Sequence, residues 1–417
     1  MSNNIKELIS ALSEEPFDAE LNFKIAQGYE NIGQNASAIS FYLRAAEYGS
    51  DRDLVYCSLL KVGLCLQQQG ERDWNVSNSF LQAIQHYPER PEAYYLISKF
   101  YEKTGSWQEC HTMAELGLHF SSKNLDYVSE LVGYSHKSVL TFQKALSAWW
   151  IDRQEESKSL FLKLATDIHL DSEHKNIVYQ NINSMGIIQD RIAIVLPVRD
   201  AGTGRAQRMI RCLNSWSKVT EGLSDVFIII DEDDVHNFEF LKDHKGKFNI
   251  TVQSQDNTLM EKINTIGLGI AHTHKYMIFI GDDITFKTPW ESRFIEYLKD
   301  KPAGLVYGNT LDLPPEINWA THPCITTNLV RAVGFYGCPA VAHNCFDNYW
   351  SDICRELGYL EFIPDVIMDH RRTAADVDAI YHKVMGLQEP DKAKYAEYKN
   401  AQFDEDLRKI RVYLGVE

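Results

Sequence analysis

The chain has 417 residues, of which 44% are hydrophobic and 24% are charged, and its formal net charge is −16 at pH 7. This composition is that of a globular protein, and the length is sufficient for two or three domains. The acidic balance excludes nonspecific nucleic-acid binding, which requires a basic face. It leaves room for a nucleotide ligand, because a bound metal ion can supply the local positive charge.

The cysteines and the hydropathy pattern indicate a compartment. The eight cysteines are scattered and none forms a CxxC pair, which excludes a zinc ribbon or a thioredoxin-type site. We expect them to be reduced thiols, as in the cytosol. The N-terminal stretch has no apolar run long enough for a signal peptide, and no run of about 18 apolar residues occurs that could span a membrane. The sequence therefore predicts a cytoplasmic protein without a membrane span.

The N-terminal third contains an internal repeat. Gly28–Ala46 and Phe100–Leu118 match with an offset of 72 positions (100 minus 28), and this offset pairs Gly33 with Gly105. A middle unit containing Gly70 fits between them. Three units of about 36 residues resemble the tetratricopeptide repeat, a helix-turn-helix of about 34 residues. The alternative is a nonrepetitive helical bundle with the same core.

The predicted domain limits follow from this pattern. Residues 1–125 are expected to form the repeats, with extra residues of the middle unit around Arg72–Val76. Residues 126–188 keep apolar residues at helical spacing and are interpreted as a helical cap or linker that covers the end of the repeat. Residues 189–417 form the remaining domain, with a helical tail. We expect the repeats to bind a protein partner or a second copy of the chain.

Strand and helix patterns alternate beyond Gly186. The predicted strands are Ile192–Pro197, Val226–Ile230, Ile250–Gln253 and Met277–Ile280, and the predicted helices are Arg205–Lys218 and Leu259–His272. This order predicts an α/β domain in which a mostly parallel sheet carries helices on its faces.

Two of these strands end in acidic clusters. The first cluster is Asp231, Glu232, Asp233 and Asp234, and the second is Asp282 and Asp283, which follow Gly281. Open α/β sheets bind ligands outside the carboxyl ends of their strands. Adjacent carboxylates repel one another, so a cation is the natural compensation, and oxygen ligands suit Mg²⁺ or Mn²⁺. The alternative for Asp282 and Asp283 is a solvated turn, and two acidic ends at one sheet edge make the binding site the better interpretation.

The C-terminal pattern resembles a glycosyltransferase of the GT-A fold, closest to family 2-like enzymes of bacterial and phage type, over about residues 192–370. The resemblance rests on VLPVRDAGTGRAQRMIRCLNSW, IIIDEDD, LMEKINTIGLGIA, YMIFIGDDITFKTPW, LVYGNTLDLPPEINWATHPCITTNLVRAVGF and DNYWSDICRELGYLEFIPDVIMDH. It implies a Rossmann-like domain that moves a sugar from a nucleotide-sugar donor, with UDP as the expected nucleotide, to a hydroxyl on a glycan, protein or other acceptor. Gly281 stands where the family often has the first Asp of its DxD motif. The resemblance therefore does not indicate which residue takes the role of that Asp.

The expected metal ligands are Asp283 and His370. The leaving group of a sugar nucleotide is a diphosphate, and a divalent cation stabilises the charge that builds as it departs. His370 follows the predicted strand FIPDVIMD, where the family pattern has a histidine. An Asp and His pair favours Mn²⁺ over Mg²⁺ as cofactor. The alternative for His370 is a structural or solvated role.

The expected catalytic base is Asp347, in HNCFDNYW. One carboxylate that accepts the proton of the acceptor hydroxyl suffices for an inverting displacement. The alternative is that Asp347 caps the helix that follows, since Asp is a favoured N-cap, and both roles can coexist. Asp352 is the second choice and is expected on the solvated face of that helix.

Seven residues are expected to contact the donor. They are Arg199, Arg205, Asp231, Asp233, Lys262, Asn264 and Asp282. The two arginines flank a loop with two glycines, which allow close backbone approach to a ligand. Asp231 is expected to contact the base or ribose. Each of four residues has an alternative to donor binding. Lys262 and Asn264 could instead be solvated residues of their helix. Arg205 could instead be no more than the first residue of a helix, and Asp233 no more than a charged loop residue.

Two other functions compete with this hypothesis. A nucleotidyltransferase also uses an α/β sheet with paired carboxylates, but it would lack the DNYW block and usually has a Gly-rich signature near the first strand. The second alternative is a noncatalytic repeat scaffold with an inactive nucleotide-binding domain. The absence of the first DxD carboxylate at Gly281 is consistent with this alternative. Sugar-nucleotide hydrolysis that needs Mn²⁺ would separate the enzyme from the scaffold.

Overall fold

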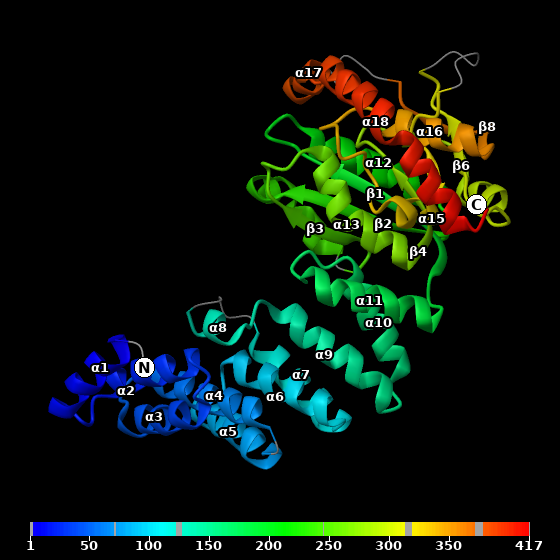
Figure 1. The fold of residues 1–417 in the computed structure, drawn as a ribbon. Helices are drawn as coiled ribbons and strands as arrows, with labels where there is room; N and C mark the ends of the chain where they lie inside the picture. The colour runs from blue at the N-terminus through cyan, green and yellow to red at the C-terminus, as the bar shows by residue number, and fades with distance from the viewer. Residues whose placement is uncertain are drawn as a thin grey trace. The chain divides into compact units, whose positions relative to one another are not determined.

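The computed structural model describes residues 3–70, 72–121, 127–244, 246–312, 319–371 and 378–416. The chain folds into two compact units (Figure 1). The helical unit comprises Met1–Leu164 and His169–Val178, and the sheet unit comprises Ala165–Ile168 and Tyr179–Glu417. The predicted boundary at residues 125 and 126 lies outside the described residues, as do residues 313–318 of the predicted acceptor segment. The predicted cap, residues 126–188, is divided between the two units.

The first part of the chain is helical throughout its described residues, as the sequence predicts. Its helices are α1 (Asn3–Glu14), α2 (Ala19–Asn31), α3 (Asn35–Tyr48), α4 (Arg52–Gln69), α5 (Asp73–His86), α6 (Pro91–Thr104), α7 (Trp107–Phe120), α8 (Tyr127–Val132), α9 (Lys137–Trp150), α10 (Gln154–Ala165) and α11 (Ser172–Met185).

The repeat is confirmed by its turns. Gly33, Gly70 and Gly105 separate the paired helices α2/α3, α4/α5 and α6/α7, and their φ angles are 74°, 73° and 73°. Glycine adopts this left-handed backbone more readily than any other residue, which explains why glycine recurs at the turn. The prediction for the middle unit is wrong in one respect. Its extra residues lengthen α4, which has 18 residues against 13 in α2, and α5 already begins at Asp73.

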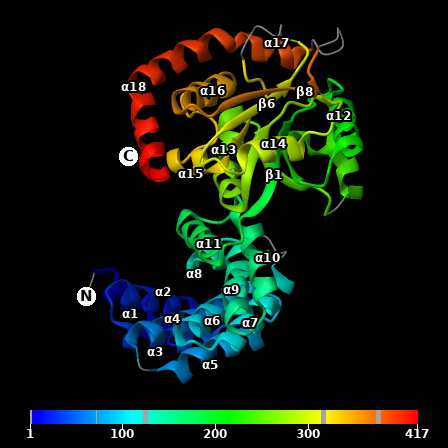
Figure 2. The ribbon, with the colours of Figure 1, turned by 90° about the vertical axis from the view of Figure 1, so that its right-hand side faces the viewer.

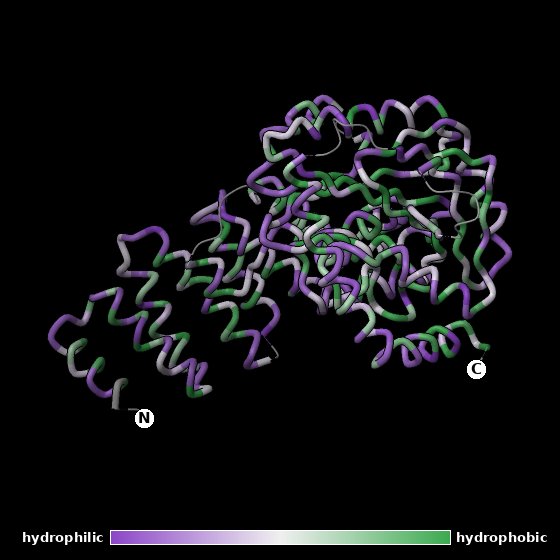
Figure 3. Tube along the Cα trace, turned by 90° about the horizontal axis from the view of Figure 1, so that it is seen from above, coloured by the Kyte–Doolittle hydropathy of each residue, from purple (hydrophilic) through white to green (hydrophobic). Residues whose placement is uncertain are grey.

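Small residues let the paired helices approach closely. Ala38, Tyr42 and Ala45 of α3 are all fully buried. Hydrophilic and hydrophobic residues alternate along the helices near the N-terminus (Figure 3), as expected when one face of each helix packs inward. Within the described residues, no helix is both long enough and apolar enough to span a membrane.

The sheet unit contains eight strands and the helices that cover them. Its elements are β1 (Gln189–Val198), α12 (Arg205–Val219), β2 (Ser224–Asp231), η1 (Glu232–His244), β3 (Asn249–Gln253), α13 (Leu259–Thr273), β4 (His274–Phe279), β5 (Thr285–Phe286), α14 (Glu291–Leu298), β6 (Leu305–Asn309), β7 (Cys324–Thr326), α15 (Thr327–Val333), α16 (Phe346–Leu357), β8 (Leu360–Asp369), α17 (Ala379–Gly386) and α18 (Gln388–Leu414).

The sheet is mixed, with the strand order β3-β2-β1-β4-β7-β6-β8-β5. The four strands predicted from the sequence, β1 to β4, pair in parallel, with Val195 opposite both Phe227 and Phe279. Beyond β4 the sheet is mixed. There β6 pairs in parallel with β8, whereas β7 pairs antiparallel with both β4 and β6, and β5 pairs antiparallel with β8. The predicted parallel pairing thus holds for β1 to β4 and for β6 with β8, and β7 and β5 depart from it.

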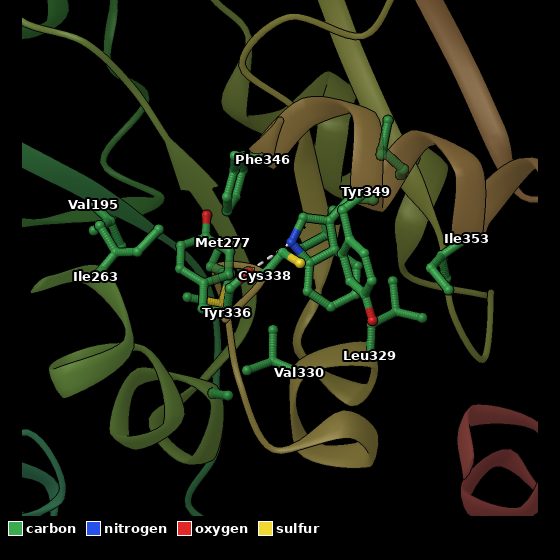
Figure 4. Close-up of a cluster of buried hydrophobic side chains, with 14 of the residues drawn as sticks. Val195, Ile263, Met277, Leu329, Val330, Tyr336, Cys338, Phe346, Tyr349 and Ile353 are labelled. Atoms are coloured by element: carbon green, nitrogen blue, oxygen red, sulfur yellow. Dashed lines mark hydrogen bonds between the residues drawn. The ribbon is translucent and has the colours of Figure 1, made fainter. Parts of the chain in front are cut away.

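The sheet is buried on both faces. Successive side chains of a strand point to opposite faces, and in β1 the residues Ala193 and Val195 join one hydrophobic cluster while Ile192, Ile194 and Leu196 join the other. The first cluster continues into α13, α15 and α16 (Figure 4). Burial on both faces explains why β1, β2 and β4 read as almost continuous apolar runs.

The C-terminal helix α18 closes the first of these faces. It packs against α15 (Figure 2). Its Asp406 accepts a hydrogen bond of 3.0 Å from the Tyr349 hydroxyl of α16. Its first turn holds the loop before α16, because Asp391 accepts hydrogen bonds from the backbone N–H groups of Ala342, His343 and Asn344. The long tail is therefore part of the fold of the sheet unit and fixes one wall of the pocket described next.

Candidate active site

A pocket of about 410 Å³ lies outside the carboxyl ends of β1 and β4. Its lining comes from the strand ends, from the loops before β7 and α16, and from helices α17 and α18. The lining residues include Arg199, Arg205, Asp282, Asp283, His322, His343, Asp347, His370, Tyr381, Met385 and Gln388. Six of the predicted site residues therefore share one pocket. Asp231, Asp233, Lys262 and Asn264 do not line it.

Asp282 is a buried carboxylate with incomplete pairing. It is 7% exposed, its Oδ1 lies 3.8 Å from Arg205, and its Oδ2 has no hydrogen-bond partner among the described residues. Burial, together with the charge of Asp283, raises the pKa of Asp282 to about 6, and Arg205 opposes this rise. A Cβ at Gly281 would lie 2.5 Å from Asp283 Oδ1. The glycine therefore leaves Asp283 room to stand where it does.

His370 stands between two carboxylates. Its Nε2 lies 3.3 Å from Asp283 Oδ2, and its Nδ1 lies 2.8 Å from Asp312 Oδ2. Burial alone would lower the pKa of His370, but the hydrogen bonds with Asp283 and Asp312 raise it to about 9. The structure thus brings the two predicted metal ligands together. Asp312 was not predicted, because nothing in the local sequence pairs it with a histidine 58 positions away.

A second histidine, His322, was missed by the sequence analysis. Its Nδ1 lies 3.3 Å from the carbonyl oxygen of Phe279, and its Nε2 is buried without a hydrogen-bond partner in the described part of the chain. Its ring lies 4.9 Å from the ring of His370 at an angle of 86°. Its φ of 52° is in the left-handed region, which is uncommon for a residue other than glycine. Only its place shortly before β7 could have drawn attention to it.

Asp347 is held by an exposed tryptophan. The Trp319 Nε1–H donates a hydrogen bond of 2.6 Å to Asp347 Oδ2, and the backbone N–H of Asn348 donates to Oδ1. Burial raises the pKa of Asp347, and the Trp319 hydrogen bond opposes that rise. The N-cap of α16 is Cys345, with a φ of 67°. Asp347 lies one residue inside the helix, so the prediction that it could be the cap is wrong.

Three carboxylates of the acidic cluster after β2 are bound by the protein itself. Asp231 is 2% exposed, pairs with Lys262 Nζ at 2.5 Å and accepts a short hydrogen bond from Arg199. Arg199 also donates two hydrogen bonds of 2.9 Å to Asp233. Asp234 accepts hydrogen bonds from two backbone N–H groups of the loop after β1. These carboxylates therefore fix the loop that carries Arg199.

Arg205, the second arginine of the pocket, is held by Asp378. Arg205 donates hydrogen bonds of 2.8 and 3.1 Å to Asp378, to which Arg208 also donates. Asp378 in turn caps α17 by accepting from the backbone N–H of Tyr381 at 2.8 Å. Burial alone would raise the pKa of Asp378, but its hydrogen bonds with Arg205 and Tyr381 lower it to about 2. Asp378 was not predicted, since its partners lie far away in the sequence.

The side chain of Asn264 is engaged with the backbone of a neighbouring loop. Its side-chain oxygen accepts from the backbone N–H groups of Tyr336 and Gly337, and its side-chain nitrogen donates to the carbonyl of Gly337 at 2.8 Å. These three bonds hold the loop after α15 against α13. They leave Asn264 outside the pocket that contains the other candidates.

The donor atoms around Asp283 can be compared with those of a metal site. Among the described residues, no three His, Cys, Asp or Glu side chains already stand in the arrangement of a metal-binding group. The pocket does contain two buried acceptor atoms without partners, Asp282 Oδ2 and His322 Nε2, beside the Asp283–His370 pair. Buried polar atoms are normally hydrogen-bonded to protein or to water, so both atoms remain available to a water molecule or to a bound group.

No protein-family model and no curated protein matches the sequence. The crystal structure of MamA is 16% identical and covers 38% of this chain and 84% of its own, with a TM-score of 0.32. Pseudomonas aeruginosa pilF is 12% identical, covers 42% of this chain and 72% of its own, and has a TM-score of 0.33. S. aureus TarS 1–349 in complex with UDP-GlcNAc is 12% identical, covers 53% and 71%, and has a TM-score of 0.37. Similarities this low carry no argument about function.

Proposed function

We propose that the sheet unit is a metal-dependent glycosyltransferase of the GT-A type. It would move a sugar from a nucleotide-sugar donor, with a UDP-sugar as the first choice, to an acceptor hydroxyl with inversion. The observation that carries the proposal is the convergence of Asp282, Asp283, His370 and Asp347 on one pocket of about 410 Å³. Acidic residues at strand ends, a histidine after β8 and a separate carboxylate on α16 supply the parts that this reaction needs.

The residues around Asp283 fit a divalent cation. Asp283 and His370 face each other, and Asp282 Oδ2 beside them lacks a hydrogen-bond partner among the described residues. We propose that Asp283 and His370 hold the cation, and a carboxylate with an imidazole favours Mn²⁺ over Mg²⁺. When bound, such a cation stabilises the charge that develops on a departing diphosphate.

The role of Asp347 follows from its surroundings. Burial makes its carboxylate a stronger base than an exposed aspartate, because it raises the pKa. Trp319 holds Oδ2 by a hydrogen bond of 2.6 Å, which fixes the direction in which the carboxylate faces. We propose that Asp347 accepts the proton of the acceptor hydroxyl as that oxygen attacks the anomeric carbon.

The donor phosphates would meet the arginines of the pocket. Arg199 and Arg205 both line it, and each is fixed by carboxylates on its far side. We propose that Asp231 and Lys262 act on the donor indirectly, because their mutual pairing sets the position of Arg199. Arg205 would offset part of the charge of Asp282, which lies 3.8 Å away.

For the helical unit we propose partner recognition. Trp107 stacks on Trp150, which is 59% exposed, with ring centroids 5.4 Å apart. Tyr94 is only 5% exposed and serves packing instead. An alanine at Trp150 should leave the fold intact and weaken self-association or acceptor use, as measured by light scattering and by turnover on a large acceptor.

A panel of nucleotide sugars tests the proposed function. We expect one nucleotide sugar to raise the melting temperature in the presence of Mn²⁺ and to lose this effect in EDTA. The same compound should be hydrolysed slowly without an acceptor, and NMR of the transferred sugar should show inverted configuration. A panel without any Mn²⁺-dependent stabilisation, or a product with retained configuration, would contradict the proposal.

A further inference from the structure

We propose that His322 is a third protein ligand of the cation, beside Asp283 and His370. The inference rests on the proposed cation site and adds to it a residue from a different part of the chain. Its starting observation is that His322 Nε2 is buried, lines the pocket and has no hydrogen-bond partner among the described residues.

The hydrogen bonding of His322 leaves Nε2 as an acceptor. Its Nδ1 lies 3.3 Å from the carbonyl oxygen of Phe279, and a carbonyl can only accept, so the ring proton belongs on Nδ1. The Nε2 atom then carries a lone pair. Metal-binding histidines generally donate their other ring N–H to a backbone carbonyl or a carboxylate, which fixes both the tautomer and the ring direction.

The two histidines share this arrangement. His370 directs Nδ1 to Asp312 at 2.8 Å and Nε2 to Asp283 at 3.3 Å, and the ring of His322 lies 4.9 Å from the ring of His370. Each ring is thus anchored through Nδ1. Asp283 and His370 pair with each other, and among the described residues no three His, Cys, Asp or Glu side chains stand in the arrangement of a metal-binding group. A cation would replace the proton between them.

Another histidine of the same pocket provides a contrast. His343 also lines the pocket, but its ring nitrogens are not among the buried atoms of the described residues that lack a hydrogen-bond partner. The observation from which the inference for His322 starts is therefore not repeated at His343. The left-handed backbone of His322, with a φ of 52°, is a strained conformation of the kind that concentrates at functional sites.

This ligand set has a consequence for metal choice. Imidazole ligands suit transition metals, whereas Mg²⁺ prefers oxygen ligands and retained water. A site with one carboxylate and two imidazoles should therefore bind Mn²⁺ or Co²⁺ in clear preference to Mg²⁺. His322 would be the residue that sets this preference.

The experiment compares His322→Asn with His343→Asn and the unmodified full-length protein. Asparagine tolerates the left-handed backbone at position 322 and removes the imidazole. Mn²⁺ affinity is measured by calorimetry, and the nitrogen atoms coupled to bound Mn²⁺ are counted by pulsed electron paramagnetic resonance. We expect His322→Asn to weaken Mn²⁺ binding by at least about 10–100-fold, the loss that removal of a partner of a metal ligand already causes. Mg²⁺ binding should change much less, and the coupled histidine nitrogens should fall from two to one. His343→Asn should leave all three measurements unchanged.

Three results would overturn the inference. The first is unchanged Mn²⁺ affinity in His322→Asn, and the second is a single coupled histidine nitrogen in the unmodified protein. If Asp283→Asn still loses Mn²⁺ binding in either case, the cation site stands and only the role of His322 is wrong. The third is the absence of Mn²⁺ binding by the unmodified protein, which would overturn the cation site of the proposed function as well.

Discussion

Two strands of the sheet end in acidic clusters, and the protein treats them differently. Asp231 and Asp233, at the end of β2, are paired with Arg199, and Asp231 is paired with Lys262 as well. Asp282, at the end of β4, has only Arg205 at 3.8 Å on one oxygen and no hydrogen-bond partner among the described residues on the other. We call these the β2 cluster and the β4 cluster.

The comparison shows that an acidic strand end becomes a candidate cation site only when the fold leaves its charge uncompensated. In the β2 cluster the paired cations are Arg199, in the loop after β1, and Lys262, in α13. The carboxylates therefore hold these two elements against the end of β2. In the β4 cluster, burial and the charge of Asp283 raise the pKa of Asp282 to about 6. The raised pKa means that the surrounding residues do not fully stabilise the ionised Asp282 carboxylate. The predictions below test this difference.

The largest expected effect is that of Asp283→Asn. The amide fills the same space but lacks the charge, so turnover and Mn²⁺-dependent nucleotide binding should both be abolished while the fold is kept. Asp233→Asn is the matched control in the β2 cluster, because Asp233 lies outside the pocket and its loss should weaken donor binding through Arg199 without removing the dependence on Mn²⁺. Turnover by Asp283→Asn close to that of Asp233→Asn would move the cation site away from β4.

Asp347→Asn should lower turnover by roughly 10²–10⁴, the usual contribution of a general base. Donor affinity, measured by calorimetry, should change little, since the base acts on the acceptor. Asp352→Asn serves as control on the same helix, where Asp352 pairs with Lys399 and Arg355 instead of lining the pocket. An equal loss of donor affinity and turnover would show that Asp347 faces the donor.

Asp231→Asn should destabilise the protein. Asp231 is 2% exposed, and its removal leaves the Lys262 ammonium, whose side chain is 12% exposed, without that partner. Removal of one partner of a buried pair costs about 3 kcal/mol in unfolding free energy. Urea denaturation measures this loss. Stability equal to that of the unmodified protein would mean that the β2 cluster is not structural.

Asp282→Asn, in contrast to Asp231→Asn, should raise the free energy of unfolding at neutral pH. The pKa of Asp282 in the folded protein, about 6, lies above the ordinary value near 3.9, so the folded state loses stability as the pH rises from about 4 to about 6. The amide avoids that loss. In EDTA the variant should therefore match the unmodified protein near pH 4 and exceed its unfolding free energy by about 3 kcal/mol above pH 7. Lower stability of the variant at neutral pH would contradict the account of the β4 cluster.

Trp319→Phe should have the smallest effect. The substitution keeps a ring but removes the N–H donor, which holds down the pKa of Asp347. That pKa should rise, so the acid limb of the pH profile of turnover should move to higher pH by less than about one unit. Tyr395→Phe, which removes a hydrogen bond to Asp352 on the same helix, should leave the limb in place.

Local patterns were sufficient to predict much of this fold. The repeat was visible because Gly33, Gly70 and Gly105 satisfy a backbone requirement that each turn imposes separately. The strands β1 to β4 were visible because burial on both faces demands apolar runs. Their carboxyl ends then placed Asp282 and Asp283 at the pocket, and the family resemblance placed His370 and Asp347 there.

The missed parts depend on contacts between distant residues. The position of His322 is defined by Phe279, the last residue of β4, and by His370, which follows β8, and its unpartnered nitrogen has no local signature. Asp378 meets Arg205 across 173 positions. The pairing of Asp231 with Lys262 likewise joins β2 to α13, so the sequence could not show that the β2 cluster is already neutralised.

The most direct test of the difference between the clusters is a calorimetric titration with UDP, in Mn²⁺ and in EDTA, of the unmodified protein, Asp283→Asn and Asp233→Asn. The account predicts that the unmodified protein and Asp233→Asn bind UDP only in Mn²⁺, and that Asp283→Asn binds it in neither. Equal affinity in Mn²⁺ and EDTA, or Mn²⁺-dependent binding that survives in Asp283→Asn, would contradict a cation-dependent donor site at the end of β4.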